Sequence, residues 1–212
     1  MSHPTPEVLA GLLAHALADM EGRGHRKHRR DNMPMLYAFR NPALAPGHEA
    51  IVSVPIPCEV WRGQASQGTY SANPADDLEM LGLGLAAAGP PVNTFGMTTT
   101  LERTDVVACA MWGRVWMLPK QSVMDEERAL RSMRGERVLH DDDRRVGGSL
   151  LQVHDVHGTQ YQILRHDGNV PVYAATRPVD GWERLTDQSA TRLGFGLAQV
   201  TAALASGRLS LP

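Results

Sequence analysis

The feature that most constrains the fold is an almost continuous apolar segment at residues 105–118, with the sequence DVVACAMWGRVWML. If its side chains alternate between two faces, as in a strand, both faces are apolar. A strand of this kind belongs inside a sheet that is covered on both sides. A buried helix is the alternative, but the valines, the two tryptophans and Gly113 favour a strand.

Strict alternation also predicts which side chains of this strand share a face. One face is expected to carry Val107, Cys109, Met111, Val115 and Met117. The other face is expected to carry Val106, Ala108, Ala110, Trp112, Trp116 and Leu118. Helices packed on the sheet would then cover both sets.

Three segments are predicted to form those helices. The first, residues 6–21, follows a Thr-Pro-Glu start and carries leucines at helical spacing, and Gly22 and Gly24 are expected to end it. The second, residues 74–88, begins with Asn-Pro and two aspartates. The third, residues 187–205, has its apolar side chains on one face.

Residues 82–87 formally match the glycine-rich pattern of dinucleotide-binding folds. That pattern requires a strand before it and glycines at the turn from the strand into a helix. Here the glycines fall inside the second predicted helix, after an acidic helix start. Close packing of this helix on another element is therefore the better explanation.

The remaining periodic segments are predicted to be strands, apart from a short helix at residues 122–135. The strands are expected at residues 33–39, 49–61, 92–101, 148–156, 160–166 and 170–175. Pro55 and Pro57 interrupt the second of these and predict an edge strand or an extended segment. The strand at 92–101 is expected to pair with the central strand, and the last three strands are expected to form a meander.

Together these elements predict an α+β fold with a mainly antiparallel sheet, a central strand at residues 105–118, and packed helices at about 6–21, 74–88 and 187–205. We expect a single domain over residues 1–212, with flexible segments at 22–32 and 136–147. The sequence contains no apolar stretch as long as a membrane-spanning helix and no signal peptide, so a soluble, cytoplasmic protein without membrane contact is expected. Two cysteines set neither a disulfide framework nor a zinc site.

The densest positive run lies at residues 23–30, although the formal net charge of the chain is −2. The candidate residues for contact with nucleic-acid phosphates are Arg23, Arg26, Lys27, Arg29 and Arg30. No aromatic residue is interleaved with them, so the run gives no support for base stacking. A solvated linker, or a polar turn that continues the first helix, is the alternative reading of this run.

Histidine is followed by aspartate at residues 140, 154 and 166, which are residue types that bind divalent metals. The predicted hairpin places His154 and His166 at opposite ends, about 15–20 Å apart at ~3.3 Å per residue, so one site that uses both is disfavoured. His140 and His166 remain the candidate metal ligands of a metal-dependent hydrolase. We find no convergent catalytic set and expect no cofactor.

Trp112, Arg114 and Trp116 follow each other on one predicted strand face. If helices cover that face, the tryptophans belong to the core; if not, the three residues form a patch suited to a protein partner. The leading hypothesis is therefore a non-enzymatic interaction or assembly protein that self-associates as a homo-oligomer. A nucleic-acid-associated accessory protein is the second hypothesis, and a metal-dependent hydrolase is the third.

Overall fold

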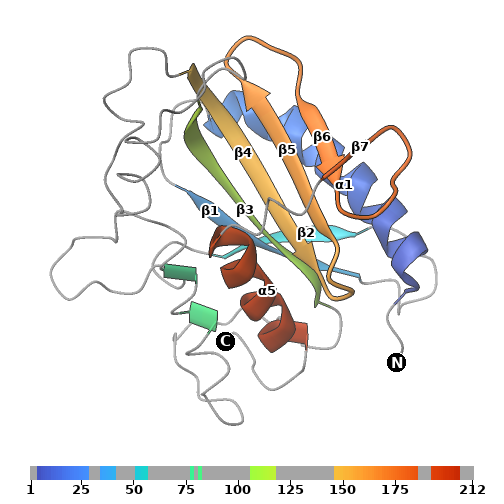
Figure 1. The fold of residues 1–212 in the computed structure, drawn as a ribbon. Helices are drawn as coiled ribbons and strands as arrows, with labels where there is room; N and C mark the ends of the chain where they lie inside the picture. Colours follow the sequence, from blue (N-terminus) through green and yellow to red (C-terminus); the bar gives the residue numbers. More distant parts are fainter. Residues whose placement is uncertain are drawn as a thin grey trace, which may run out of the picture.

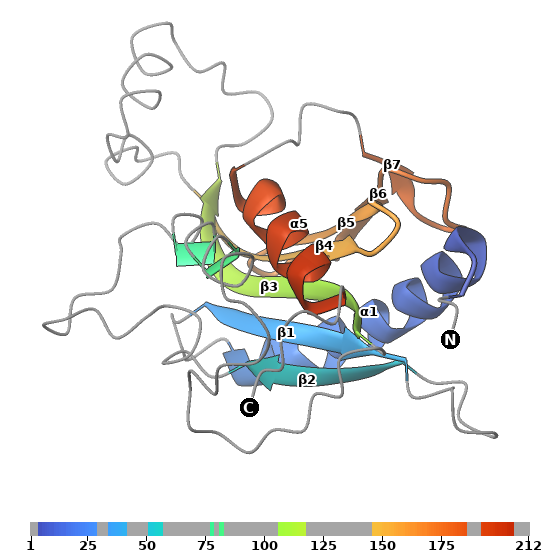
Figure 2. The same cartoon turned by 90° about the horizontal axis from the view of Figure 1, so that it is seen from below.

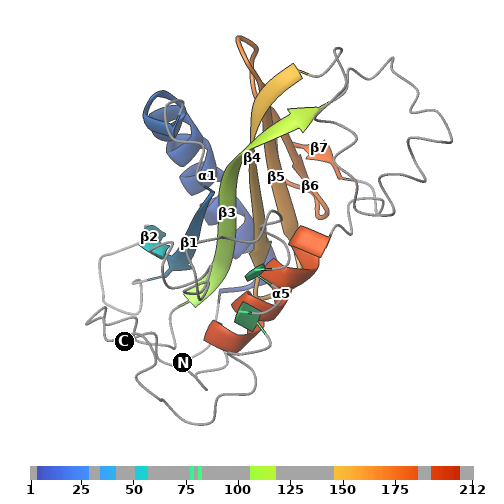
Figure 3. The same cartoon turned by 90° about the vertical axis from the view of Figure 1, so that its left-hand side faces the viewer.

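The computed structural model describes residues 4–28, 34–41, 51–56, 77–78, 81–82, 106–117, 146–185 and 192–205. In this part of the chain a seven-stranded sheet lies between helix α1 (Pro6–His28) and helix α5 (Arg192–Ala205), as Figure 1 shows. The two helices pack on opposite faces of the sheet (Figure 3). The predicted α+β class and the mainly antiparallel sheet are confirmed.

The strands are β1 (Met35–Arg40), β2 (Val52–Ile56), β3 (Val106–Met117), β4 (Val146–Asp155), β5 (Gln160–His166), β6 (Val172–Ala175) and β7 (Glu183–Arg184). They lie in the order β2-β1-β3-β4-β5-β6-β7, which can be followed in Figure 2. Every neighbouring pair is antiparallel except β6 and β7, which are parallel. The long apolar strand β3 lies inside the sheet between β1 and β4, as its two apolar faces require.

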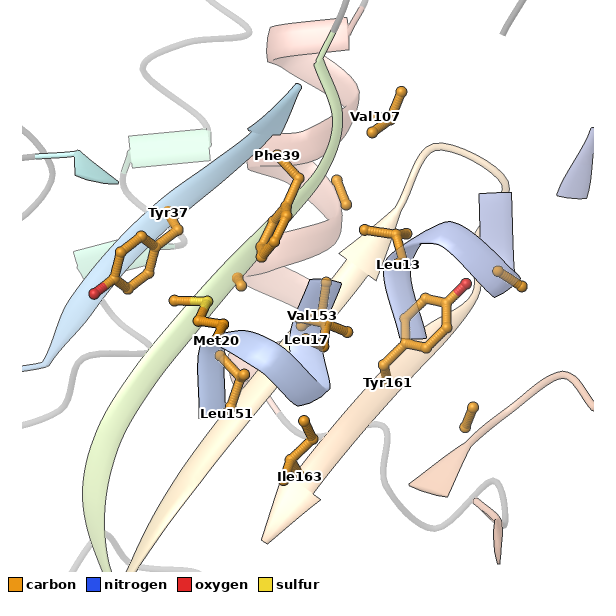
Figure 4. Close-up of a cluster of buried hydrophobic side chains, with 14 of the residues drawn as sticks. Leu13, Leu17, Met20, Tyr37, Phe39, Val107, Leu151, Val153, Tyr161 and Ile163 are labelled. Atoms are coloured by element: carbon orange, nitrogen blue, oxygen red, sulfur yellow. The ribbon is translucent and has the colours of Figure 1, made fainter. Parts of the chain in front are cut away.

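Each face of the sheet supports its own hydrophobic core. The largest fully buried side chains of the α1-side core are Leu9, Leu13, Leu17, Phe39, Leu151, Tyr161 and Ile163, most of which are shown in Figure 4. The α5-side core includes Leu36, Leu78, Cys109, Met111, Leu197, Val200 and Leu204. Full burial of one leucine contributes about 1.5–3 kcal/mol, so the apolar stripes of the two helices are what hold them to the sheet.

A β-bulge at Val107 changes which side chains of β3 share a face. Phe39 pairs with Ala108, whereas Arg40 pairs with Val106, so Val107 is an extra residue opposite β1. Val106 consequently lies in the α5-side core, and Val107 lies in the α1-side core next to Ala108. The predicted faces of these two valines were wrong, because strict alternation fails at a bulge.

Helix α1 is longer than predicted. It is 23 residues long and continues through Gly22 and Gly24 to His28, so the predicted end at these glycines was wrong. A glycine inside a helix costs only about 1 kcal/mol relative to alanine. Basic residues near a helix C-terminus interact favourably with the helix dipole. The reading in which the basic run continues the first helix therefore fits the backbone as far as His28.

The sheet has short or interrupted margins among the described strands. Strand β2 is the edge strand next to β1, as its prolines predicted, and Pro55 lies within it opposite Tyr37. At the other margin, β7 contributes only two residues. Proline in a strand is tolerated at such an edge because it has no amide hydrogen to donate.

Several predicted elements lie wholly or mostly outside the described residues. The helix predicted at 74–88 is described only at Asp77–Leu78 and Leu81–Gly82, which are helical, and Leu78 is fully buried. The strand predicted at 92–101 and the short helix predicted at 122–135 lie outside the described residues. Within the described part, no helix has both the length and the hydropathy to cross a membrane.

Candidate functional site

The α1-covered face of the sheet becomes polar toward the C-terminal end of α1. The register places Arg114 opposite Ser149, and Ser149 opposite Arg165, so these residues form one row across β3, β4 and β5. The row before it on the same face is apolar and consists of Trp112, Leu151 and Ile163. The polar row is therefore the point where charged side chains replace the hydrophobic core.

Glu21 and Arg165 join α1 to β5 at this row. The Arg165 guanidinium donates to both carboxylate oxygens of Glu21, with its Nη2 at 2.6 Å from Oε2. The Glu21 carboxylate is buried, with 4% of its side chain exposed. Hydrogen bonding to Glu21 raises the pKa of Arg165, whose guanidinium is charged at any physiological pH. This bidentate pair fixes the position of α1 two residues before its basic segment begins.

Arg114 forms a second bidentate pair, with Asp167. Both of its terminal nitrogens lie 2.8 Å from the Asp167 carboxylate oxygens, and the two side chains are 28% and 37% exposed. Asp167 begins the turn between β5 and β6, in which Gly168 adopts a φ of +85° that favours glycine. The backbone oxygen of Asn169, in the same turn, accepts a longer bond of 3.4 Å from Arg165. The two arginines thus bond two different residues of this turn.

A buried carboxylate organises the opposite end of the α1-covered face. Asp155 Oδ1 accepts the backbone amides of His157 and Thr159, and its Oδ2 accepts the hydroxyl of Tyr161 at 2.9 Å. His157 Nε2 lies 2.8 Å from the carbonyl oxygen of Pro4, which precedes α1. These contacts connect the turn between β4 and β5 to the start of α1, so the Asp155 carboxylate has a structural role.

A third polar group lies under α5. Cys109 of β3 pairs directly with His154 of β4, and the Thr201 hydroxyl of α5 is close to both strands. Burial raises the pKa of the Cys109 thiol to about 12, so it is not a thiolate at neutral pH. Burial also lowers the pKa of His154, whose Nδ1 has no hydrogen-bond partner. A neutral thiol beside a neutral imidazole is not the activated pair of a cysteine nucleophile.

The structure describes two of the three side chains in the predicted Trp-Arg-Trp patch. Trp112 is 4% exposed and belongs to the α1-side core. Arg114 lies in the charged row and is partly exposed. Trp116 is part of the β3 backbone, but its side chain lies outside the described set. In the described part, Arg114 is the member of this patch that a partner can reach.

The predicted metal ligands are described only in part. His166 ends β5 opposite Gly148, whereas His154 pairs with Gln160 at the other end of the same hairpin. This register confirms the predicted separation of the two histidines, about 20 Å at ~3.3 Å per residue. His140 lies outside the described residues. Among the residues with a described position, no group of three or more His, Cys, Asp or Glu is arranged to hold a metal ion.

Three of the five predicted basic residues occupy the last turns of α1. Arg23, Arg26 and Lys27 belong to its described backbone, whereas Arg29 and Arg30 lie outside the described residues. Positions 23, 26 and 27 follow the i, i+3, i+4 spacing of one side of a helix. The helix backbone therefore places these three basic positions on one side, two or more residues beyond Glu21, which pairs with Arg165.

The ion pair between Glu21 and Arg165 has no local signal in the sequence. The two residues are 144 positions apart, and only the packing of α1 on β5 brings them together.

Comparison of the chain with protein-family models, with curated proteins and with solved structures finds no match in any of the three.

Proposed function

We propose that this protein binds nucleic acid through the basic C-terminal turns of α1. Ion pairs between phosphates and the side chains of Arg23, Arg26 and Lys27 would supply the affinity, independently of base sequence. The observation that carries the proposal is the continuity of α1 from its last buried apolar residue, Met20, through to His28. Basic positions on an ordered helix share one side, whereas the same residues in a flexible linker would not.

The described acidic groups near the run support this reading. Glu21 is the acid that precedes the run most closely, and it is paired with Arg165 in a buried contact. Asp31 directly follows Arg30 and lies outside the described residues. Asp167, at the same end of the α1-covered face, is paired with Arg114. Both carboxylates are paired with arginines of the sheet. Their negative charges are therefore neutralised within the sheet and do not cancel the positive charge of the run.

The polar clusters in the described part support binding over catalysis. The Asp155 carboxylate accepts hydrogen bonds from the turn between β4 and β5 and from the Tyr161 hydroxyl. The two bidentate arginine pairs fix α1 and the turn between β5 and β6. The Cys109 thiol is neutral and fully buried. None of these groups is both activated and open to a substrate, which is what a catalytic site requires.

The test is a binding titration of the full chain with labelled single-stranded and duplex DNA at several salt concentrations. We expect the triple variant Arg23→Gln, Arg26→Gln, Lys27→Gln to bind much more weakly. If all three residues contact phosphates of a duplex, the slope of log K against log salt falls by about 2.7 in magnitude. Affinity that is insensitive to salt, or unchanged in the triple variant, would contradict the proposal.

Two control variants separate charge from folding. Arg23→Lys with Arg26→Lys keeps the charges and is expected to retain binding. Arg177→Gln removes an exposed arginine that bonds the His157 carbonyl, near the opposite end of α1, and should leave binding unchanged. Circular dichroism checks each variant, because a basic residue near a helix C-terminus stabilises the helix by about 0.3–1 kcal/mol.

Self-association is the second candidate function. Arg114 is the residue of the predicted interface that is described as partly exposed. We expect a homo-oligomer of this kind to weaken in an Arg114→Glu variant. Light scattering after size-exclusion chromatography, at several protein concentrations, measures this; a monomer throughout would remove the proposal.

A further inference from the structure

We propose that the nucleic acid is single-stranded and that Tyr173 and Trp182, which flank α1, stack on its bases. This inference rests on the proposed function and names the class of its ligand. The basic run itself contains no aromatic residue, and Tyr173 and Trp182 would provide the aromatic side chains that stacking requires. The aromatic residues come from β6 and from the loop that follows it, far from the run in the chain.

The two rings form a pair at the margin of the α1-side core. Tyr173 pairs with Ile163 of β5, so its side chain is on the face that α1 covers. Its ring centroid is 5.2 Å from that of Trp182, at an interplanar angle of 58°. Trp182 in turn meets the buried ring of Tyr161 edge to face, with centroids 5.9 Å apart. Tyr173 and Trp182 are both half-buried, so each is held by the core on one side and is open on another.

Tyr173 is the member of this aromatic pair that lies next to the charged row, because it pairs with Ile163, in the row before Arg165. Burial raises the pKa of Tyr173, the charge of Glu21 adds to that effect, and the charge of Arg165 opposes it. Tyr173 is therefore within electrostatic range of the pair that anchors the end of α1. The basic positions 23, 26 and 27 follow Glu21 by about 3–9 Å along the helix axis, at ~1.5 Å per residue. A strand that passes the aromatic pair can reach the basic turns of the same helix.

The combination of rings and cations selects single strands. Aromatic side chains stack on any base, but in a duplex the base faces are already stacked on one another. One stacked base contributes about 1–3 kcal/mol, which corresponds to a change of about 5-fold to 150-fold in affinity. Arginines contribute the sequence-independent attraction to the backbone. The alternative is that Tyr173 and Trp182 only close the margin of the core, in which case they do not affect binding.

The test compares Tyr173→Leu with Tyr173→Phe in the full chain. Leucine keeps apolar bulk and removes the ring, whereas phenylalanine keeps the ring. Binding is measured by fluorescence anisotropy with an oligo(dT) of about 15 nucleotides, and with a duplex of the same length. We expect Tyr173→Leu to weaken single-strand binding by about 5-fold or more, and to leave duplex binding unchanged, while Tyr173→Phe binds as the parent does.

The outcomes separate this inference from the proposed function. If Tyr173→Leu binds oligo(dT) as the parent does while the triple variant of the basic run does not, stacking is rejected and phosphate binding stands. Duplex binding as tight as single-strand binding also rejects it. If Tyr173→Leu does not fold, tryptophan fluorescence decides: quenching by oligo(dT) that Trp182→Phe abolishes supports stacking, and its absence overturns the inference.

Discussion

The hydroxyl of Tyr161 donates a buried hydrogen bond to Oδ2 of Asp155, over a distance of 2.9 Å. The other oxygen of the same carboxylate accepts two backbone amides of the turn between β4 and β5. Asp155 is 1% exposed and Tyr161 is fully buried, so water cannot replace either partner. The arrangement uses one side chain to satisfy three donors and to set the path of the turn.

We expect Asp155→Asn to lower the free energy of unfolding by about 1–3 kcal/mol, because an amide NH2 then faces groups that also donate. Tyr161→Phe removes only one hydrogen bond and leaves the two backbone amides satisfied, so its cost is about 0.5–1.5 kcal/mol. Urea unfolding of both variants measures the difference. A larger loss in Tyr161→Phe than in Asp155→Asn would show that the backbone contacts of the carboxylate are of minor importance.

The two bidentate arginine pairs are expected to differ in their importance for stability. Arg165→Met leaves the buried Glu21 carboxylate without its partner, which costs about 3–5 kcal/mol. Arg114→Met breaks a pair whose two side chains are both partly exposed, which costs about 0–1 kcal/mol. Chemical denaturation of the two variants provides the comparison. Equal losses would mean that the burial of Glu21 does not control the strength of its pair.

Gly82 and Gly11 offer a matched test of helix packing. A Cβ atom built on Gly82 would lie 2.7 Å from Cβ of Gln199 on α5, so Gly82→Ala is expected to destabilise the protein by about 1–3 kcal/mol. Gly11 is in α1 with no neighbouring atom within 4 Å of its Cβ position, so Gly11→Ala should stabilise it by about 0.5–1 kcal/mol. Thermal unfolding measures both shifts, and shifts of the same sign would contradict the packing of the 81–82 segment on α5.

Cys109 is expected to make stability fall at alkaline pH. Its folded pKa of about 12 is raised by burial above the unfolded value of roughly 8.5. The unfolded chain therefore loses the thiol proton first, so the contribution of Cys109 is complete below pH ~8.5 and declines as pH rises from there toward 12. Cys109→Ala should flatten the decline between pH ~8.5 and 10.

A thiol reagent gives an independent readout of the same burial. In a Cys58→Ser background, Cys109 is expected to react only after the protein is unfolded by denaturant, because the folded site is closed and holds a neutral thiol. Rapid labelling of the native protein at pH ~8 would show that α5 opens readily from the sheet.

The elements that could be predicted from the sequence are those whose signal is local. Two apolar faces place β3 inside the sheet, and the turn residues at 157–158 and 167–169 define the strands on either side of them. Helical spacing likewise predicts the buried stripes of α1 and α5, including Leu13 and Leu197. These patterns repeat over several residues, so one exception does not obscure them.

The features that escaped prediction depend on contacts between distant segments. The bulge at Val107 appears only when β3 is paired with β1, and it changes the faces of two valines that look interchangeable in the sequence. Glycine usually marks a helix end, but Gly22 lies between the last buried turn of α1 and its basic turns. For the candidate site, charge density marked the basic run, while neither the Glu21 contact nor the Tyr173 and Trp182 pair has a spacing that reveals it.

The composition of the two outer strands has a consequence for this protein at high concentration. Pro55 has no amide hydrogen to offer a neighbouring chain, and β7 is too short to recruit one. Among the described strands, a fibril that extends the sheet would have to begin at β2 or β7. Both strands offer few backbone hydrogen bonds to an added strand. Concentrated samples should therefore stay free of amyloid as long as the fold is intact. If a Pro55→Val variant forms amyloid under the same conditions, Pro55 is what prevents fibril growth at the β2 edge.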